Sequence, residues 1–174
     1  FILGDMRDFD LGRRFGLIII SCNSLAHLIA TEEVRACFAA LRRHLAPGGL
    51  LAFDVVRPDL HALSRREGEW RRLDLGPNPA SAIQAEETAS YDPIGQIRTS
   101  QWRVRHPGQP ERTMAPLVLR QFFPQEIPLL LQAEGLELVD RYGDFARNPL
   151  TADSLNQICL ARAVPHPGLP PSPA

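Results

Sequence analysis

Hydrophobic residues in the first third of the chain change from a continuous run to a helical stripe and back to a continuous run. The segment GLIII, residues 16–20, is apolar and rich in β-branched residues, which predicts a strand buried on both faces. Thr31 can cap a helix that opens with two glutamates, which suit the positive end of the helix dipole. Its apolar stripe consists of Val34, Cys37, Phe38, Leu41 and Leu45. APGG, residues 46–49, stops this helix, and LLAFDVV, residues 50–56, completes a βαβ unit that implies a parallel sheet.

Polar and apolar residues alternate from about residue 65 to residue 123, between short clusters of Gly, Pro and Asn. This pattern predicts half-exposed antiparallel strands. A helical period returns at Pro124, and Gly135 is a favourable stop for that helix. Pro128 lies where internal hydrogen bonding should begin, so it predicts a distorted first turn.

The end of the chain combines two further strands with a proline-rich tail. LELVDRY, residues 136–142, and NQICLARA, residues 156–163, predict the strands. Residues 164–174 contain little that could be buried, and we expect them to be disordered.

The composition is that of one soluble globular domain: 174 residues, 44% of them hydrophobic, 22% charged, with a formal net charge of -1. All 19 basic residues are arginine and they are scattered, so neither nucleic acid nor an anionic membrane is an expected partner. No apolar run is long enough for a membrane span and no signal peptide is visible, so we expect a cytoplasmic location. Cys22, Cys37 and Cys159 are far apart, which predicts buried thiols rather than disulfides. The histidines are dispersed, and no metal site is expected.

Polar residues follow several of the predicted strands. In an open parallel sheet, ligands bind at the carboxyl ends of the strands. Four short segments are expected there: Asp5–Met6, Ser21–Leu28, Asp54–Asp59 and Tyr142–Asp144. Their convergence predicts a binding site at this edge of the sheet.

Four segments resemble the second half of a class I S-adenosylmethionine-dependent methyltransferase. They are GDMRDF, ISCNSLAHL, LRRHLAPGGLLAFDVV and LLLQAEGLELVDRYGDF. The nearest likeness is to small-molecule N-methyltransferases related to glycine N-methyltransferase and the amino-sugar methyltransferases, and it covers most of residues 1–163. The resemblance implies an α/β fold: a Rossmann-like sheet without its first two strands and with an antiparallel β insertion or lid at 65–123. It also implies S-adenosyl-L-methionine as cofactor and methyl transfer by in-line displacement to a small-molecule acceptor, expected to be an amine.

The resemblance assigns the cofactor to two segments of the chain. Asp5 would accept a hydrogen bond from the adenine amino group, and the Met6 backbone would reach a ring nitrogen. Ser21 and Cys22 would lie beside the methionyl part through their backbone atoms. The alternative interpretations are an Asx turn for Asp5 and a small buried filler for Cys22.

The acceptor side is implied in the same way. Asn23 would lie near the acceptor, and His27 would orient it or accept a proton; a surface or capping histidine is the alternative. Asp54, which ends a buried strand, needs a partner, and Arg57 could pair with it or bind an anionic acceptor. The alternative for Arg57 is an exposed loop residue.

Two more residues could line the acceptor side. They are Arg120 and Tyr142, and Tyr142 could equally belong to the edge of the core. The sequence identifies neither the acceptor nor the choice between N- and O-methylation, and it leaves the oligomeric state open.

The glycine-rich turn that the family uses for the cofactor is absent, since the chain has no Gly-x-Gly. We therefore expect the chain to be a truncated fragment that binds the cofactor weakly by itself, with the turn upstream. A non-catalytic binding or scaffold domain derived from a methyltransferase is the alternative. A nicotinamide-dependent oxidoreductase fits less well, because the order of GDM and NSLAHL is that of a methyltransferase.

Overall fold

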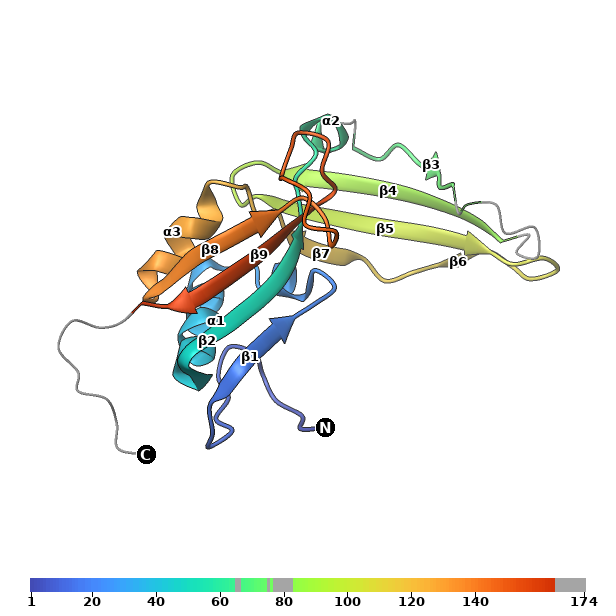
Figure 1. Cartoon of the computed structure of the whole chain (residues 1–174). Coiled ribbons are helices and arrows are strands. Elements are labelled where there is room, and N and C mark those ends of the chain that lie inside the picture. Colours follow the sequence, from blue (N-terminus) through green and yellow to red (C-terminus); the bar gives the residue numbers. More distant parts are fainter. Residues whose placement is uncertain (65–66, 75, 77–82, 165–174) are drawn as a thin grey trace. The chain divides into compact units, whose positions relative to one another are not determined.

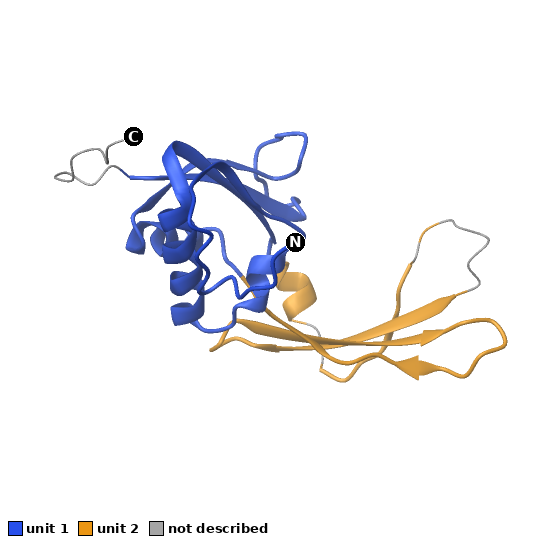
Figure 2. Ribbon diagram, turned by 90° about the horizontal axis from the view of Figure 1, so that it is seen from below, with its two compact units in different colours: residues 1–57, 122–174 blue, residues 58–121 orange. Residues whose placement is uncertain are grey.

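The computed structural model describes residues 1–64, 67–74, 76 and 83–164. These residues form two compact units (Figure 2). The first unit comprises Phe1–Arg57 and Phe122–Ala174, and the second comprises Pro58–Gln121. The predicted tail lies outside the described residues except for Val164. No helix in the described part of the chain is long and apolar enough to cross a membrane.

A four-stranded sheet forms the centre of the first unit (Figure 1). The unit contains β1 (Phe15–Ile20), η1 (Ser24–His27), α1 (Thr31–His44), β2 (Leu45–Val56), α3 (Glu126–Ala133), β8 (Leu136–Tyr142) and β9 (Asn156–Ala163). The strand order is β1-β2-β9-β8, with β1 parallel to β2 and both other pairs antiparallel. The predicted βαβ unit and both final strands are therefore confirmed.

The core of this unit lies between the sheet and its helices. Leu51, Phe53 and Val55 alternate along β2 and are buried, because successive side chains of a strand point to opposite faces. Phe38 of α1 packs on Phe53 with ring centroids 5.8 Å apart. Burial of side chains of this size contributes roughly 2 kcal/mol each, so the α1–β2 packing is a main source of stability.

Strand β1 differs from the prediction that it is buried on both faces. Leu17 and Ile19 are 53% and 64% exposed. The reason is its position, since β1 pairs only with β2 and is the edge of the sheet among the described residues. A continuous apolar run predicts a strand, but it does not tell which of its faces is covered.

The ends of α1 also differ from the prediction. Thr31 is the first helical residue and not the cap, which is Ala30. The capping group is the Glu33 carboxylate, which accepts hydrogen bonds from the backbone N–H groups of Ala30 at 3.1 Å and Ile29 at 3.0 Å. The helix ends at His44, so Leu45 belongs to β2 and the APGG segment lies within the first part of that strand.

Helix α3 begins two residues later than Pro124. Pro128 is consequently its third residue, where the backbone N–H has no partner within the helix and its absence costs no helical hydrogen bond. Pro128 therefore does not require the distorted first turn that the sequence predicted. The predicted stop is confirmed, because Gly135 follows the helix with φ of +68°.

The second unit consists of an antiparallel sheet and one short helix. It contains α2 (Leu60–Leu63), β3 (Arg71–Arg72), β4 (Gln84–Asp92), β5 (Ile97–Arg105), β6 (Arg112–Thr113) and β7 (Leu117–Arg120). The order is β3-β4-β5-β6, with β7 also paired to β5, and every pairing is antiparallel as predicted. Its function as an insertion or lid stays a prediction.

Candidate active site at the carboxyl ends of β1 and β2

Two polar residues are held together where β1 and β2 end. The backbone N–H of Asn23 donates to Oδ2 of Asp54 at 2.9 Å, and the Asn23 side-chain Oδ1 accepts from the backbone N–H of Val56 at 3.0 Å. Asp54 is only 8% exposed. The structure thus gives Asp54 the partner that its burial requires, and that partner is the backbone of Asn23. The reciprocal bonds fix the turn after β1 to the end of β2.

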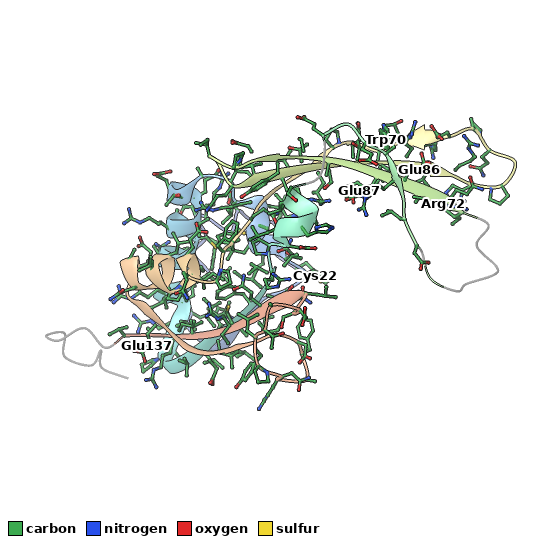
Figure 3. The ribbon with its side chains drawn as sticks, turned by 90° about the horizontal axis from the view of Figure 1, so that it is seen from above. Cys22, Trp70, Arg72, Glu86, Glu87 and Glu137 are labelled. Atoms are coloured by element: carbon green, nitrogen blue, oxygen red, sulfur yellow. The ribbon has the colours of Figure 1, made fainter. Side chains whose placement is uncertain are left out.

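The turn itself has an unusual backbone. Cys22 and Asn23 are consecutive residues in the left-handed region, with φ of 60° and 57°. Asn tolerates this conformation, whereas Cys pays a steric cost for it. Ser21 and Cys22 are both exposed, and Figure 3 labels Cys22 in this unit. The interpretation of Cys22 as a buried filler is therefore wrong.

The other two cysteines are buried, as predicted. Burial raises the pKa of the Cys37 thiol to about 12 and that of Cys159 also to about 12. Neither is a nucleophile at neutral pH.

The segment from Ser24 to His27 forms the short helix η1. The Ser24 hydroxyl donates to the Ser21 carbonyl oxygen at 2.6 Å, while Leu25 and Ala26 are buried beneath the turn. His27 is the last residue of η1 and is exposed. An exposed imidazole at this position is accessible to a ligand, and its catalytic role stays a prediction.

Asp5 is exposed and already has partners. Its Oδ1 accepts from the backbone N–H of Arg7 at 2.9 Å, and its Oδ2 accepts from Nη2 of the same residue at 2.6 Å. These contacts lower the pKa of Asp5 to about 2, with the side-chain hydrogen bond from Arg7 as the largest cause. The Asx turn that was the alternative interpretation is present. Met6, next to it, is half-buried.

The sequence reasoning missed how Asp5 is connected to the rest of the site. Arg7 also forms an ion pair with Glu33, whose carboxylate caps α1. The backbone N–H of Ala30 and the Arg7 guanidinium lower the pKa of Glu33. A continuous set of polar contacts therefore joins Asp5 to the segment that follows η1. The sequence feature that could have predicted this contact is Glu33, because a glutamate at the third helical position often accepts hydrogen bonds from the backbone at the start of the helix.

Arg57 and Tyr142 both contact the loop that precedes β9. Arg57 donates from Nε to the Ser154 carbonyl oxygen at 2.5 Å and from its backbone N–H to that of Leu155 at 2.9 Å. It is half-buried, so the alternative of an exposed loop arginine is wrong. Tyr142 forms an isolated bridge with Pro149 in the same loop. Arg120 lies in the second unit, where it ends β7 and is 7% exposed.

Gln157 is a second residue that the sequence reasoning missed. It pairs with Val55 across the sheet and is fully buried, and its Nε2 donates to the Phe122 carbonyl oxygen at 2.7 Å. This bond joins the start of β9 to the segment that precedes α3. Among the described residues, no group of three His, Cys, Asp or Glu side chains could hold a metal ion.

Comparison with solved structures relates this arrangement to known proteins. The CcbJ methyltransferase from Streptomyces caelestis aligns over 94% of this chain and 63% of its own, with a TM-score of 0.82 and 27% identity. An S-adenosylmethionine-dependent methyltransferase from Clostridium acetobutylicum aligns over 94% of this chain and 64% of its own, with a TM-score of 0.75 and 16% identity. The chain has the methyltransferase fold. The resemblance found in the sequence is confirmed.

Sequence comparison finds methyltransferases as well. A dTDP-3-amino-3,4,6-trideoxy-alpha-D-glucopyranose N,N-dimethyltransferase of Streptomyces venezuelae is 34% identical over 93 residues, 41% of this chain and 39% of that protein. A dTDP-4-amino-2,3,4,6-tetradeoxy-D-glucose N,N-dimethyltransferase of Saccharopolyspora spinosa is 38% identical over 52 residues, 30% of this chain and 21% of that protein. The chain therefore matches about two fifths of the length of the first of these relatives. No protein-family profile matches the chain.

Proposed function

We propose that the protein takes part in methyl transfer from S-adenosylmethionine to the amine of a small-molecule acceptor, with a nucleotide-linked amino sugar as the acceptor class. The observation that carries this proposal is the similarity to two N,N-dimethyltransferases of dTDP-amino sugars, together with the methyltransferase fold. The exposed turn at the end of β1 supports it, since this edge is where open α/β sheets bind ligands.

Two features of the described residues support the proposed cofactor site. The turn at Ser21 and Cys22 is exposed and is held rigidly by the Asn23–Asp54 contact, as a binding edge should be. Asp5 is ionised and exposed. In this proposal its carboxylate accepts a hydrogen bond from the adenine amino group while it keeps its contact with Arg7, and the Met6 backbone contacts a nitrogen of the adenine ring. S-adenosylmethionine supplies an activated methyl group, so the protein needs mainly to orient the acceptor and exclude water.

The acceptor would lie beside η1 in this proposal. Asn23 positions the turn, and the exposed imidazole of His27 takes up the proton that the amine loses as its nitrogen bonds to the methyl carbon. Asp54, Arg57 and Tyr142 are the proposed acceptor-side residues of the first unit. Asp54 contributes indirectly, because its carboxylate fixes the turn at Asn23.

The test uses the protein expressed from its complete reading frame. It is incubated with S-adenosylmethionine carrying a labelled methyl group and with a panel of dTDP-amino sugars. Label in an N-methylated sugar, with an equal amount of S-adenosylhomocysteine, is the expected result. Binding of the cofactor without transfer to any amine would instead support the scaffold alternative, and the proposal would be wrong.

Paired variants separate the proposed roles from general structural effects. His27→Gln should lower kcat, whereas His61→Gln, an exposed histidine of the second unit, should not. Asp5→Asn should weaken cofactor binding measured by calorimetry, whereas Asp8→Asn, on the neighbouring exposed carboxylate, should not. If each pair behaves alike, the assigned residues do not carry these roles.

A further inference from the structure

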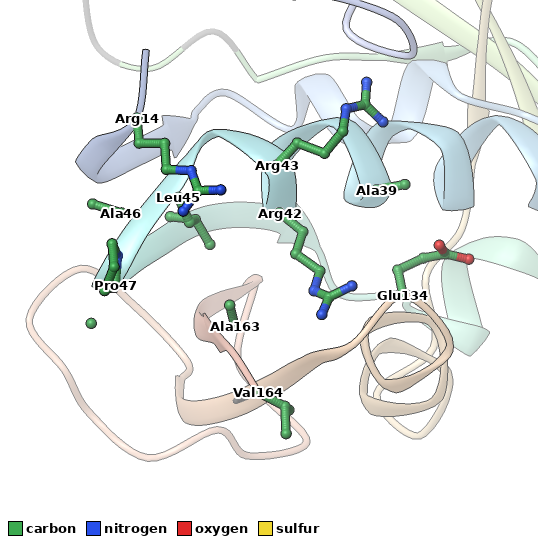
Figure 4. Close-up of a pocket in the computed structure, with 11 residues that line it drawn as sticks. Arg14, Ala39, Arg42, Arg43, Leu45, Ala46, Pro47, Glu134, Ala163 and Val164 are labelled. Atoms are coloured by element: carbon green, nitrogen blue, oxygen red, sulfur yellow. The ribbon is translucent and has the colours of Figure 1, made fainter. Parts of the chain in front are cut away.

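A concave site lies at the end of the sheet opposite to the turn at Asn23. A pocket of about 630 Å³ opens where β1 and β2 begin and where β9 ends (Figure 4). Arg14, Arg42 and Arg43 line it, together with Pro47 and Gly48 of the β2 start. Because strands β1 and β2 are parallel, both begin at one end of the sheet and both finish at the opposite end. The pocket is therefore separate from the candidate active site.

The charge of this pocket is positive and largely uncompensated. Within the described part of the chain, neither Arg14 nor Arg42 has a carboxylate at ion-pair distance. Arg43 is 4.0 Å from the exposed carboxylate of Asp8. The acid that lines the pocket, Glu134, accepts from Nε of Arg35 at 2.6 Å, so its charge is already balanced.

The Arg42 guanidinium occupies the space that a side chain at position 135 would need. A Cβ atom added to Gly135 would lie 2.9 Å from Cζ and 3.0 Å from Nε of Arg42. The guanidinium therefore lies directly against the glycine backbone.

We propose that this pocket binds a small anion carrying a diphosphate group. Guanidinium groups bind phosphate oxygens through paired hydrogen bonds, so the guanidinium groups of Arg14 and Arg42 would bind the two phosphates of a diphosphate. Arg42 and Arg43 lie in the last turn of α1, where the negative end of the helix dipole stabilises their positive charge, so the dipole is not an argument for a bound anion. The diphosphate can come from free pyrophosphate or from a nucleoside diphosphate.

The test is calorimetric titration of the full chain at low ionic strength, where screening is weak. The ligands are pyrophosphate, adenosine diphosphate and adenosine. Saturable binding of pyrophosphate to the wild-type chain is expected, and Arg42→Gln should weaken it by at least about tenfold. Arg112→Gln is the matched control, because it removes one exposed arginine from β6 of the other unit. Arg14→Gln is a second variant in case Arg42→Gln does not fold.

The three ligands identify the source of the diphosphate. Tighter binding of adenosine diphosphate than of pyrophosphate supports a nucleotide, and equal binding supports free pyrophosphate. The proposal is overturned if pyrophosphate does not bind, if Arg42→Gln weakens the binding of adenosine as much as that of adenosine diphosphate, or if Arg42→Gln and Arg112→Gln have the same effect. None of these results depends on methyl transfer.

Discussion

The contact between Asn23 and Asp54 makes a quantitative prediction about stability. Asp54→Ala removes an acceptor that is 8% exposed and leaves the Asn23 N–H, 2.9 Å from it in the wild-type protein, without that partner. A hydrogen bond to a charged group contributes about 1.5–3 kcal/mol, so the free energy of unfolding should fall by about 2 kcal/mol. Asp54→Asn keeps an acceptor oxygen and loses only the charge. It should cost about 1 kcal/mol, the difference between a charged and a neutral hydrogen bond.

The assay must follow the unit that contains the mutation. Both tryptophans, Trp70 and Trp102, lie in the second unit, whereas α1 and α3 belong to the first. Urea unfolding should therefore be followed by far-ultraviolet circular dichroism, which reports the helices, with tryptophan fluorescence recorded as the internal reference. The reasoning is refuted if Asp54→Ala changes the unfolding free energy by less than about 0.5 kcal/mol, the scatter of surface substitutions. It is equally refuted if Asp54→Asn costs as much as Asp54→Ala.

Three further predictions concern the backbone and the charges. The pKa of Asp5 in the folded protein, about 2, is below its ordinary value. Its ion pair with Arg7 is therefore fully stabilising at any pH above that ordinary value, and the stabilisation is lost as the pH falls through about 2. NMR titration of the carboxyl group should show this low midpoint, and Arg7→Gln should raise it. Gly135→Ala should lower the unfolding free energy by about 1–2 kcal/mol, because an L-residue must adopt φ of +68° there and its Cβ displaces Arg42; urea unfolding measures this, and an unchanged midpoint would contradict it. Cys22→Gly should stabilise the protein by about 0.5–1 kcal/mol, since relief of the left-handed strain exceeds the entropy that glycine loses; a destabilised variant in the same assay would show that the side chain matters more.

Periodicity in the sequence was sufficient for the elements and for most of the pairing. The apolar stripe of α1 and the continuous run of β2 identify themselves, because helix and strand periods differ. Periodicity was not sufficient to predict which side chains are buried. The apolar run of β1 predicts a strand, but the exposure of Leu17 and Ile19 depends on which elements cover this edge strand. Helix ends were also imprecise, since the cap of α1 comes from Glu33 within the helix and not from Thr31.

The candidate site was predictable only as a location. Topology placed the Asn23 turn beside Asp54, because parallel strands end at the same edge of a sheet. The actual hydrogen-bond partners were not predictable, since Asp54 binds a backbone N–H that any residue at position 23 other than proline could supply. The sequence contained no indication of the arginine pocket, because Arg14, Arg42 and Val164 are distant in sequence from one another and meet only in the folded protein.

The contrast among the three thiols has a practical consequence. Cys22 is exposed at the end of β1, while Cys37 and Cys159 are buried with pKa values of about 12. A maleimide dye applied near neutral pH would therefore attach at a single place in the native protein. That place is the rim of the candidate active site, so an unmutated chain already carries the attachment point for a fluorescent reporter of ligand binding.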